Sequence, residues 1–325
     1  MKRRDATLAL LVAPLSAAFA QQPARVARIG YLSHPTRESV ERGVTAFVAR
    51  LAQLGWVEGR NLVIEYRWAE GDAARLPALA RELVDRRVDL IVAPAGVAAL
   101  AAKQATTTIP IVMIFPFDPV GMGLVSDLRR PGGNVTGTTF APGRELVGKQ
   151  LQLLKEALPG LVRVGLLRNP TDPGWSQQQA ALESAATSLG LRLQYVDVSD
   201  DAGLERAFDA FARERAQALM VAGSSTYLVL RARIAALAIQ RKLPTMSSYR
   251  EMVEAGILMG YAVNMADFVG HSAGYVDRIL RGAKPADMAI EQPTRFELVI
   301  NAKTAAAIGT TLPPALLQRA DDVIR

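Results

Sequence analysis

The stretch Asp89-Leu90-Ile91-Val92-Ala93, followed by a helical pattern over 96–105, determines the interpretation of the whole chain. Its run of apolar, β-branched residues predicts a buried strand, and the run Ile111-Val112-Met113-Ile114-Phe115 repeats the pattern after the helix. Near-continuous apolar strands joined by helices are typical of a parallel sheet covered on both faces. This segment therefore predicts an α/β fold.

The same alternation extends in both directions along the chain. Upstream, strands are predicted at 28–32 and 61–66 and helices at 38–54 and 73–86. After a Pro- and Gly-rich break at 131–137, a second series predicts strands at 163–167, 191–196, 218–222, 244–246 and 257–260, and helices at 177–189, 202–213 and 228–240. Two series of similar size predict two Rossmann-like lobes with a ligand cleft between them and a tight hinge rather than a flexible linker.

The N-terminus has the pattern of a secretory signal peptide. Lys2, Arg3 and Arg4 precede an apolar run over 6–15, and small residues then lead to Ala20. This order of charge, apolar core and small residues predicts a signal peptide over 1–20 that is cleaved after Ala20, and hence a protein exported from the cytoplasm. The apolar run is too short to cross a bilayer of about 30 Å, and no later segment approaches that length, so no integral membrane segment is expected in the mature chain.

Cysteine and charge narrow the class of protein further. The chain has no cysteine, so neither disulfides nor a lipid-modified N-terminal cysteine are expected. The net charge is +7, and removal of residues 1–20, with three basic residues and one acidic residue, leaves +5. The basic residues are scattered among acidic ones, which argues against a nucleic-acid partner.

No set of residues predicts an enzyme, a metal site or a cofactor. The stretch 143–149 has the spacing of a phosphate-binding loop, but Gln150 stands where Ser or Thr holds magnesium, so a capped helix start is expected. His34 and His271 are not at metal-ligand spacing. Gly223-Ser224-Ser225 lacks the geometry of a nucleophile elbow.

Binding residues are expected where strands end, because ligands of open α/β sheets lie beyond the carboxyl ends of the strands. Helix N-termini there offer free amide groups to an anion. An alternative is that Ser and Asn cap helices and that Asp before Pro forms a turn. The positions selected are Ser33, the turn Pro94-Ala95-Gly96, Asp118, Asn169, the run Ser224-Ser225-Thr226-Tyr227, and Ser248-Tyr249.

Several motifs resemble one known family. In the last third these motifs lie at 275–287, 291–301, 303–305 and 312–314; earlier motifs are Asp118-Pro119-Val120-Gly121 and the stretch 130–137. Together they resemble the ABC transporter substrate-binding family that includes tryptophan- and aromatic-amino-acid-binding proteins. The resemblance covers essentially the whole mature chain.

The resemblance implies a type I periplasmic-binding-protein fold, whose chain crosses between the lobes three times. The crossings are expected near Thr138, near Gly260-Tyr261 and near Gln292-Pro293. One lobe then comprises residues 26–138 plus 262–291, and the other comprises 139–261 plus 292–325.

The resemblance also implies an amino-acid-like or aromatic carboxylate ligand. Asp118 is then expected to face an ammonium group, and Ala95-Gly96 and Ser225 to face a carboxylate. Tyr227 or Tyr261 is expected to cover the side chain. Thr139, next to the first crossing, completes the candidate set.

The resemblance further implies a periplasmic monomer that closes around its ligand and docks on an ABC permease driven by an ATPase. A periplasmic sensor that presents its closed form to a receptor is an alternative. An exported α/β enzyme is a third class, which the missing catalytic residues disfavour.

Overall fold

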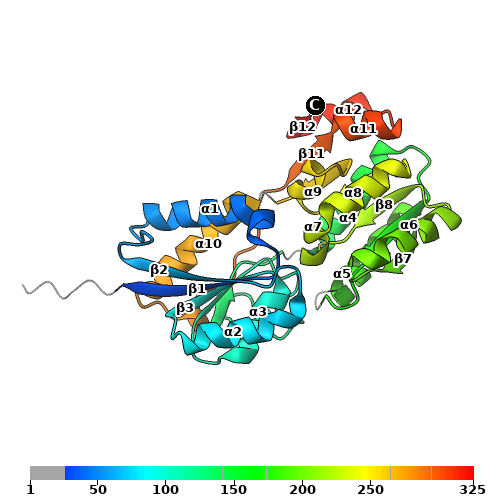
Figure 1. Cartoon of the computed structure of the whole chain (residues 1–325). Coiled ribbons are helices and arrows are strands. Elements are labelled where there is room, and N and C mark those ends of the chain that lie inside the picture. The colour runs from blue at the N-terminus through cyan, green and yellow to red at the C-terminus, as the bar shows by residue number, and fades with distance from the viewer. Residues whose placement is uncertain (1–25, 141–142, 173–174, 264, 294) are drawn as a thin grey trace, which may run out of the picture.

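The computed structural model describes residues 26–140, 143–172, 175–263, 265–293 and 295–325, which form two α/β lobes (Figure 1). Each lobe is built on one sheet of mostly parallel strands, so the predicted fold class is confirmed. The predicted signal peptide lies outside the described residues. Within the described ranges, no helix is both long and apolar enough to cross a membrane.

The first sheet consists of five parallel strands in the order β2-β1-β3-β4-β5. They are β1 (Ala27–Ser33), β2 (Leu62–Trp68), β3 (Leu90–Pro94), β4 (Ile111–Ile114) and β5 (Val135–Gly137). Apart from Pro94, every residue of β3 and β4 is buried, as near-continuous apolar runs predict for the centre of a covered sheet.

Helices cover both faces of the first sheet. On one face lie α1 (Arg37–Gln53) and α10 (Met265–Leu280), and on the other α2 (Leu76–Asp85) and α3 (Gly96–Ala105) (Figure 1). Val44, Phe47 and Leu51 recur at helical spacing on α1 and share one core with residues of the sheet and of α10. The first lobe therefore includes α10, which comes more than a hundred residues after β5 in the sequence.

The second sheet has seven strands in the order β12-β11-β10-β9-β8-β6-β7. They are β6 (Arg163–Arg168), β7 (Arg192–Asp197), β8 (Ala218–Val221), β9 (Thr245–Ser247), β10 (Met259–Ala262), β11 (Glu297–Asn301) and β12 (Asp322–Ile324). The expected parallel arrangement holds for every neighbouring pair except β10 and β11, which are antiparallel. β11 runs the other way because the chain returns to this sheet after packing α10 on the first lobe.

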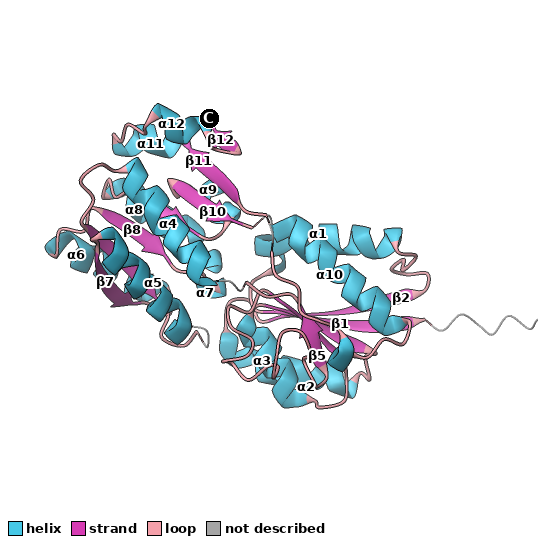
Figure 2. Cartoon of the chain, turned by 180° about the vertical axis from the view of Figure 1, so that it is seen from behind, coloured by secondary structure: helices cyan, strands magenta, loops and turns pink. Residues whose placement is uncertain are grey.

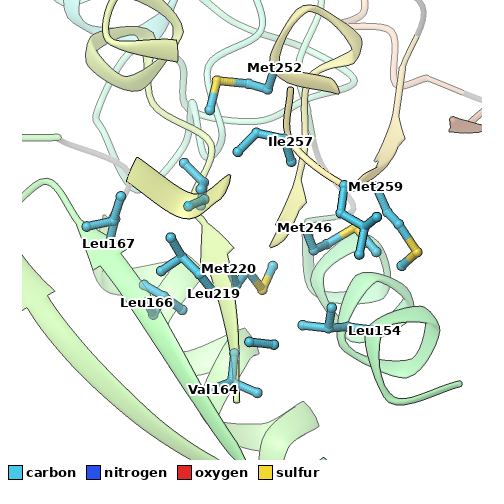
Figure 3. Close-up of a cluster of buried hydrophobic side chains, with 14 of the residues drawn as sticks. Leu154, Val164, Leu166, Leu167, Leu219, Met220, Met246, Met252, Ile257 and Met259 are labelled. Atoms are coloured by element: carbon cyan, nitrogen blue, oxygen red, sulfur yellow. The ribbon is translucent and has the colours of Figure 1, made fainter. Parts of the chain in front are cut away.

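The helices of the second lobe enclose a large apolar core. They are α4 (Gly143–Ala157), α5 (Trp175–Leu189), α6 (Leu204–Arg213), α7 (Ser225–Val229), α8 (Arg231–Gln240), α9 (Arg250–Glu254), α11 (Ala302–Ile308) and α12 (Pro314–Gln318). Helices α4 and α5 pack side by side (Figure 2). Leu166, Leu219 and Met246, from three neighbouring strands, converge with Leu154 of α4 in the buried core (Figure 3).

Several elements differ from the sequence-based prediction. The helix expected over 228–240 is two helices, α7 and α8, because Leu230 has a ψ of 6° and leaves the helical range. The stretch 131–137, expected as a break, ends in a strand, β5, at the edge of the first sheet. In addition, the predicted helices near 73 and 202 each begin with a short 3-10 turn, Ala73–Arg75 and Asp201–Gly203.

Three connections join the lobes. The first follows β5, the second follows β10, and the third follows Glu291, which forms a parallel bridge with Thr138. Gly137 stands at the end of β5, directly before this bridge. It has a φ of +129°, and a Cβ atom there would lie 2.1 Å from the carbonyl oxygen of Met113. The first connection therefore requires glycine at its start.

We expect Gly137→Ala to destabilise the protein by about 2–5 kcal/mol, because the added methyl group clashes with a backbone atom at a strained φ. Urea unfolding followed by circular dichroism measures the change. Gly133→Ala is the matched control, since a Cβ atom there meets nothing within 4 Å; it should stay within about 0.5 kcal/mol of the parent. Equal stability of the two variants would contradict this interpretation.

Candidate functional site

Two neighbouring cavities lie where the lobes meet. The first, cavity A, encloses about 500 Å³ of space between atoms, a volume that includes open solvent. Both lobes contribute to its walls. Its lining residues are Ala95, Gly96, Val97, Phe115, Phe117, Met122, Phe140, Leu146, Asp172, Gly223, Ser225, Ser248 and Tyr249.

Loops at the ends of strands supply most of these side chains. Gly96 follows β3 and Phe115 follows β4 in the first lobe, whereas Asp172, Ser225 and Tyr249 follow β6, β8 and β9 in the second. Since the carboxyl ends of parallel strands open toward one edge of a sheet, each lobe presents a row of such loops. The two rows face each other across cavity A.

The backbone is strained at two positions in the first-lobe wall. Ala95 has a φ of +68° and Phe115 a φ of +65°, a region that L-residues seldom occupy and that costs of order 1–3 kcal/mol per residue. The Ala95 amide donates to the Ile114 carbonyl at 2.7 Å, which ties the two strand ends together. These conformations place the start of α3 and the Phe115 ring at the wall of cavity A.

An aromatic wall runs from one lobe to the other. The Phe115 and Phe140 rings lie 5.0 Å apart, and the Phe140 ring meets Tyr249 edge-on at 6.3 Å. Burial raises the pKa of Tyr249 above its ordinary value, and the negative charges of Asp172 and Glu251 add to the effect, so its phenol stays neutral at physiological pH. Such a wall favours a flat apolar or aromatic group.

Polar groups of opposite electrostatic character line cavity A. On the first-lobe side, the N-terminus of the ten-residue helix α3 begins at Gly96 and presents backbone amides that attract an anion. On the second-lobe side stand the Asp172 carboxylate and the hydroxyls of Ser225 and Ser248. Ser248 Oγ accepts from Gln150 Nε2 at 3.1 Å, which fixes its position. The cavity can thus hold a molecule with both an anionic and a cationic group.

The second cavity, cavity B, shares Ala95, Phe115, Ser225 and Tyr249 with cavity A and encloses about 660 Å³ of space between atoms, a volume that includes open solvent. It extends toward α1 and is mainly apolar. Its other lining residues are Tyr31, Ser33, Pro35, Ser39, Val40, Gly43, Pro94, Leu228, Glu251 and Val269.

The structure brings half of the predicted site residues to these cavities. The seven that line one or both are Ser33, Pro94, Ala95, Gly96, Ser225, Ser248 and Tyr249. The seven that line neither are Asp118, Thr139, Asn169, Ser224, Thr226, Tyr227 and Tyr261.

The two tyrosines of the second group are held by other contacts. Tyr227 is fully buried in the core of the second lobe, where its hydroxyl donates to the Val198 carbonyl at 2.9 Å. The Tyr261 ring stacks on Phe296 at 5.6 Å, between β10 and the strand that follows the third connection. Both tyrosines contribute to packing rather than to a cavity wall.

Asn169 and Thr139 shape the loops beside the cavities. Asn169 Nδ2 donates to Thr226 Oγ1 at 3.1 Å, and its Oδ1 accepts from the Thr171 amide at 3.1 Å. Thr139 Oγ1 donates to the Pro116 carbonyl at 2.7 Å. These are the local capping and turn contacts that Ser, Thr and Asn often make at strand ends.

Asp118 begins a turn, and its carbonyl oxygen accepts from the Met122 amide at 2.9 Å.

Sequence reasoning did not select Phe140, Asp172 or Glu251. Asp172 belongs to the same loop as Asn169, so considering that whole loop would have found it. Glu251 lies in a short helix and carries no signal in the sequence.

Comparisons with known proteins agree with this architecture. The family model described as "ABC transporter substrate binding protein" matches residues 25–324. A tyrosine-binding protein of Clostridioides difficile is 26% identical over 278 residues, which is 85% of this chain and 78% of that protein.

Two solved structures are also similar. A conserved domain protein from Vibrio cholerae has a TM-score of 0.86 and 28% identity, covering 92% of this chain and 100% of that chain. An ABC domain from Streptococcus pneumoniae in complex with L-Trp has a TM-score of 0.85 and 27% identity, covering 92% of this chain and 99% of that one. Since the family model matches nearly the full length, this chain belongs to the family of ABC transporter substrate-binding proteins.

Proposed function

We propose that the chain is the periplasmic substrate-binding component of an ABC importer and that it captures an amino acid with an aromatic side chain. The observation that carries this proposal is cavity A, where an anion-attracting helix end, a carboxylate and an aromatic wall meet between two lobes. The tyrosine-binding relative and the L-Trp complex support the same class of ligand. The role is binding without turnover, with a permease and its ATPase as partners.

Each part of an amino acid has a counterpart in the cavity. The amides at the start of α3 face the α-carboxylate, with Ser225 as a further donor. Asp172 takes the α-ammonium group, the role expected for Asp118 from the sequence, because Asp172 lines the cavity and Asp118 does not. Phe115, with Tyr249, packs against the side chain.

Hinge closure follows from the division of these contacts between the lobes. The α3 end belongs to the first lobe, and Asp172 and Ser225 belong to the second, so all three contacts form only when the lobes are together. A ligand that binds the closed form better shifts the population toward it. We place the lobe boundaries at 26–138 plus 262–291 and at 139–261 plus 292–325, and the exported precursor loses residues 1–20.

L-Trp or L-Tyr should raise the melting temperature of the purified protein by about 5–10 °C at a concentration near 100 Kd, because only the folded state binds. A thermal-shift titration measures this. 3-Phenylpropanoate, which has the ring and carboxylate of L-Phe without its ammonium group, should give a clearly smaller shift than L-Phe. If no aromatic amino acid shifts the transition, the proposed ligand class is wrong.

Asp172→Asn should weaken amino-acid binding at least about tenfold, equivalent to about 1.4 kcal/mol, because it removes the charge opposite the ammonium group. Isothermal titration calorimetry gives the Kd. Asp118→Asn makes the same chemical change outside both cavities and should leave the Kd within about twofold. A larger loss from Asp118→Asn than from Asp172→Asn would refute the assignment.

A further inference from the structure

Cavity B contains polar atoms that no contact inside the protein satisfies. Among the described residues, six buried side-chain atoms have no hydrogen-bond partner, and two of them, Ser33 Oγ and Glu251 Oε2, belong to residues that line cavity B. The other four belong to residues that line neither cavity. An unsatisfied buried polar atom destabilises a protein by about the free energy of one hydrogen bond or more. The presence of two such atoms at one cavity therefore points to a ligand group that pairs with them.

The two residues come from opposite lobes. Ser33 ends β1 in the first lobe and is 1% exposed. Glu251 lies on α9 in the second lobe, and its Oε2 atom has essentially no contact with solvent. A group that bonds to both of them spans the cleft in the same way as a ligand in cavity A.

The surroundings of Glu251 favour a neutral partner. Burial raises the pKa of Glu251 above its ordinary value, and the charge of Glu254 adds to this; a hydrogen bond from its own backbone amide and the charges of Arg42 and Arg231 oppose it. Arg42 is itself paired with Glu254, with Nη1 at 2.7 and 2.9 Å from the two carboxylate oxygens. Arg231 Nη1 donates to the Leu228 carbonyl at 2.7 Å.

Cavity B adjoins cavity A. Phe115 and Tyr249 border both cavities, so the two spaces adjoin at these rings. The walls of cavity B are mainly apolar, as at Val40 and Leu228, apart from the two unsatisfied oxygen atoms.

We propose that Ser33 and Glu251 form a specificity subsite that binds an uncharged hydrogen-bond donor at the end of the ligand's aromatic side chain, such as a phenol hydroxyl or an indole N–H. This inference rests on the proposed function and adds a basis for selecting among aromatic amino acids. A site with buried polar groups rejects a ligand that leaves them unpaired.

The test compares L-Tyr with L-Phe, which differ by one hydroxyl group, by calorimetric measurement of both Kd values. The parent protein should bind L-Tyr at least about tenfold more tightly. Glu251→Ala should reduce this preference to within about threefold, mainly by weakening L-Tyr. Glu251→Gln keeps an acceptor oxygen and should retain most of the preference. Ser33→Ala should lower the preference by a smaller factor.

Glu254→Ala is the matched control, because Glu254 is on the same helix and lines neither cavity. It should leave the ratio of the two Kd values unchanged even if it alters closure. The ligand-free Glu251→Ala protein should melt no lower than the parent, since the change removes an unsatisfied buried atom. A lower melting temperature together with an unchanged ratio of the L-Tyr and L-Phe Kd values would indicate a purely structural role and overturn the proposal.

Two outcomes separate this inference from the function on which it rests. If both amino acids bind but the parent shows no preference for L-Tyr, or if Glu251→Ala keeps the preference, the subsite is refuted and the proposed function stands. If neither L-Tyr, L-Phe nor L-Trp binds, the proposed function fails, and the subsite fails with it.

Discussion

The shared direction of the strands in each sheet is the constraint on which the rest of the structure depends. Because β1, β3 and β4 run parallel, their carboxyl ends open toward one edge of the first sheet, and β6, β8 and β9 do the same in the second. The three connections bring these two edges together, so loops far apart in the sequence line one cleft. Chain direction and the crossings between lobes, rather than any single motif, create the site.

Local patterns in the sequence were enough to predict most elements of the fold. The helix over 96–105 has the predicted bounds, and the strand predicted at 163–167 extends by one residue. These elements follow from the alternation of apolar strands and amphipathic helices, which each segment carries by itself. The reversed strand β11 and the break at Leu230 were missed, because pairing across the sheet and packing at the cleft decide them.

The lining of the cavities was predictable where chain direction alone determines it. Ala95, Gly96 and Ser225 follow strands whose ends open toward the cleft, and the strand-end rule selected them. The same rule also selected Tyr227, whose side chain packs into the core, because the rule identifies a loop and not the direction of each side chain. The rule did not select Glu251, because only the tertiary structure shows that its Oε2 atom is buried without a partner.

Under the proposed hinge closure, the free energy that closes the cleft has to come largely from the ligand. The ion pair between Arg42 of α1 and Glu254 of α9 joins the lobes at 2.7 Å, but the Arg42 side chain is 69% exposed, so the pair contributes about 0–1 kcal/mol. In the proposed mechanism, closure without a ligand would leave Ser33 and Glu251 with buried, unpaired oxygens that water would solvate when the lobes separate, at about 1–3 kcal/mol each. The empty closed form would therefore be disfavoured by the same atoms that a matching ligand would satisfy. The proposed selection of the ligand and the proposed change of shape would thus depend on one set of contacts.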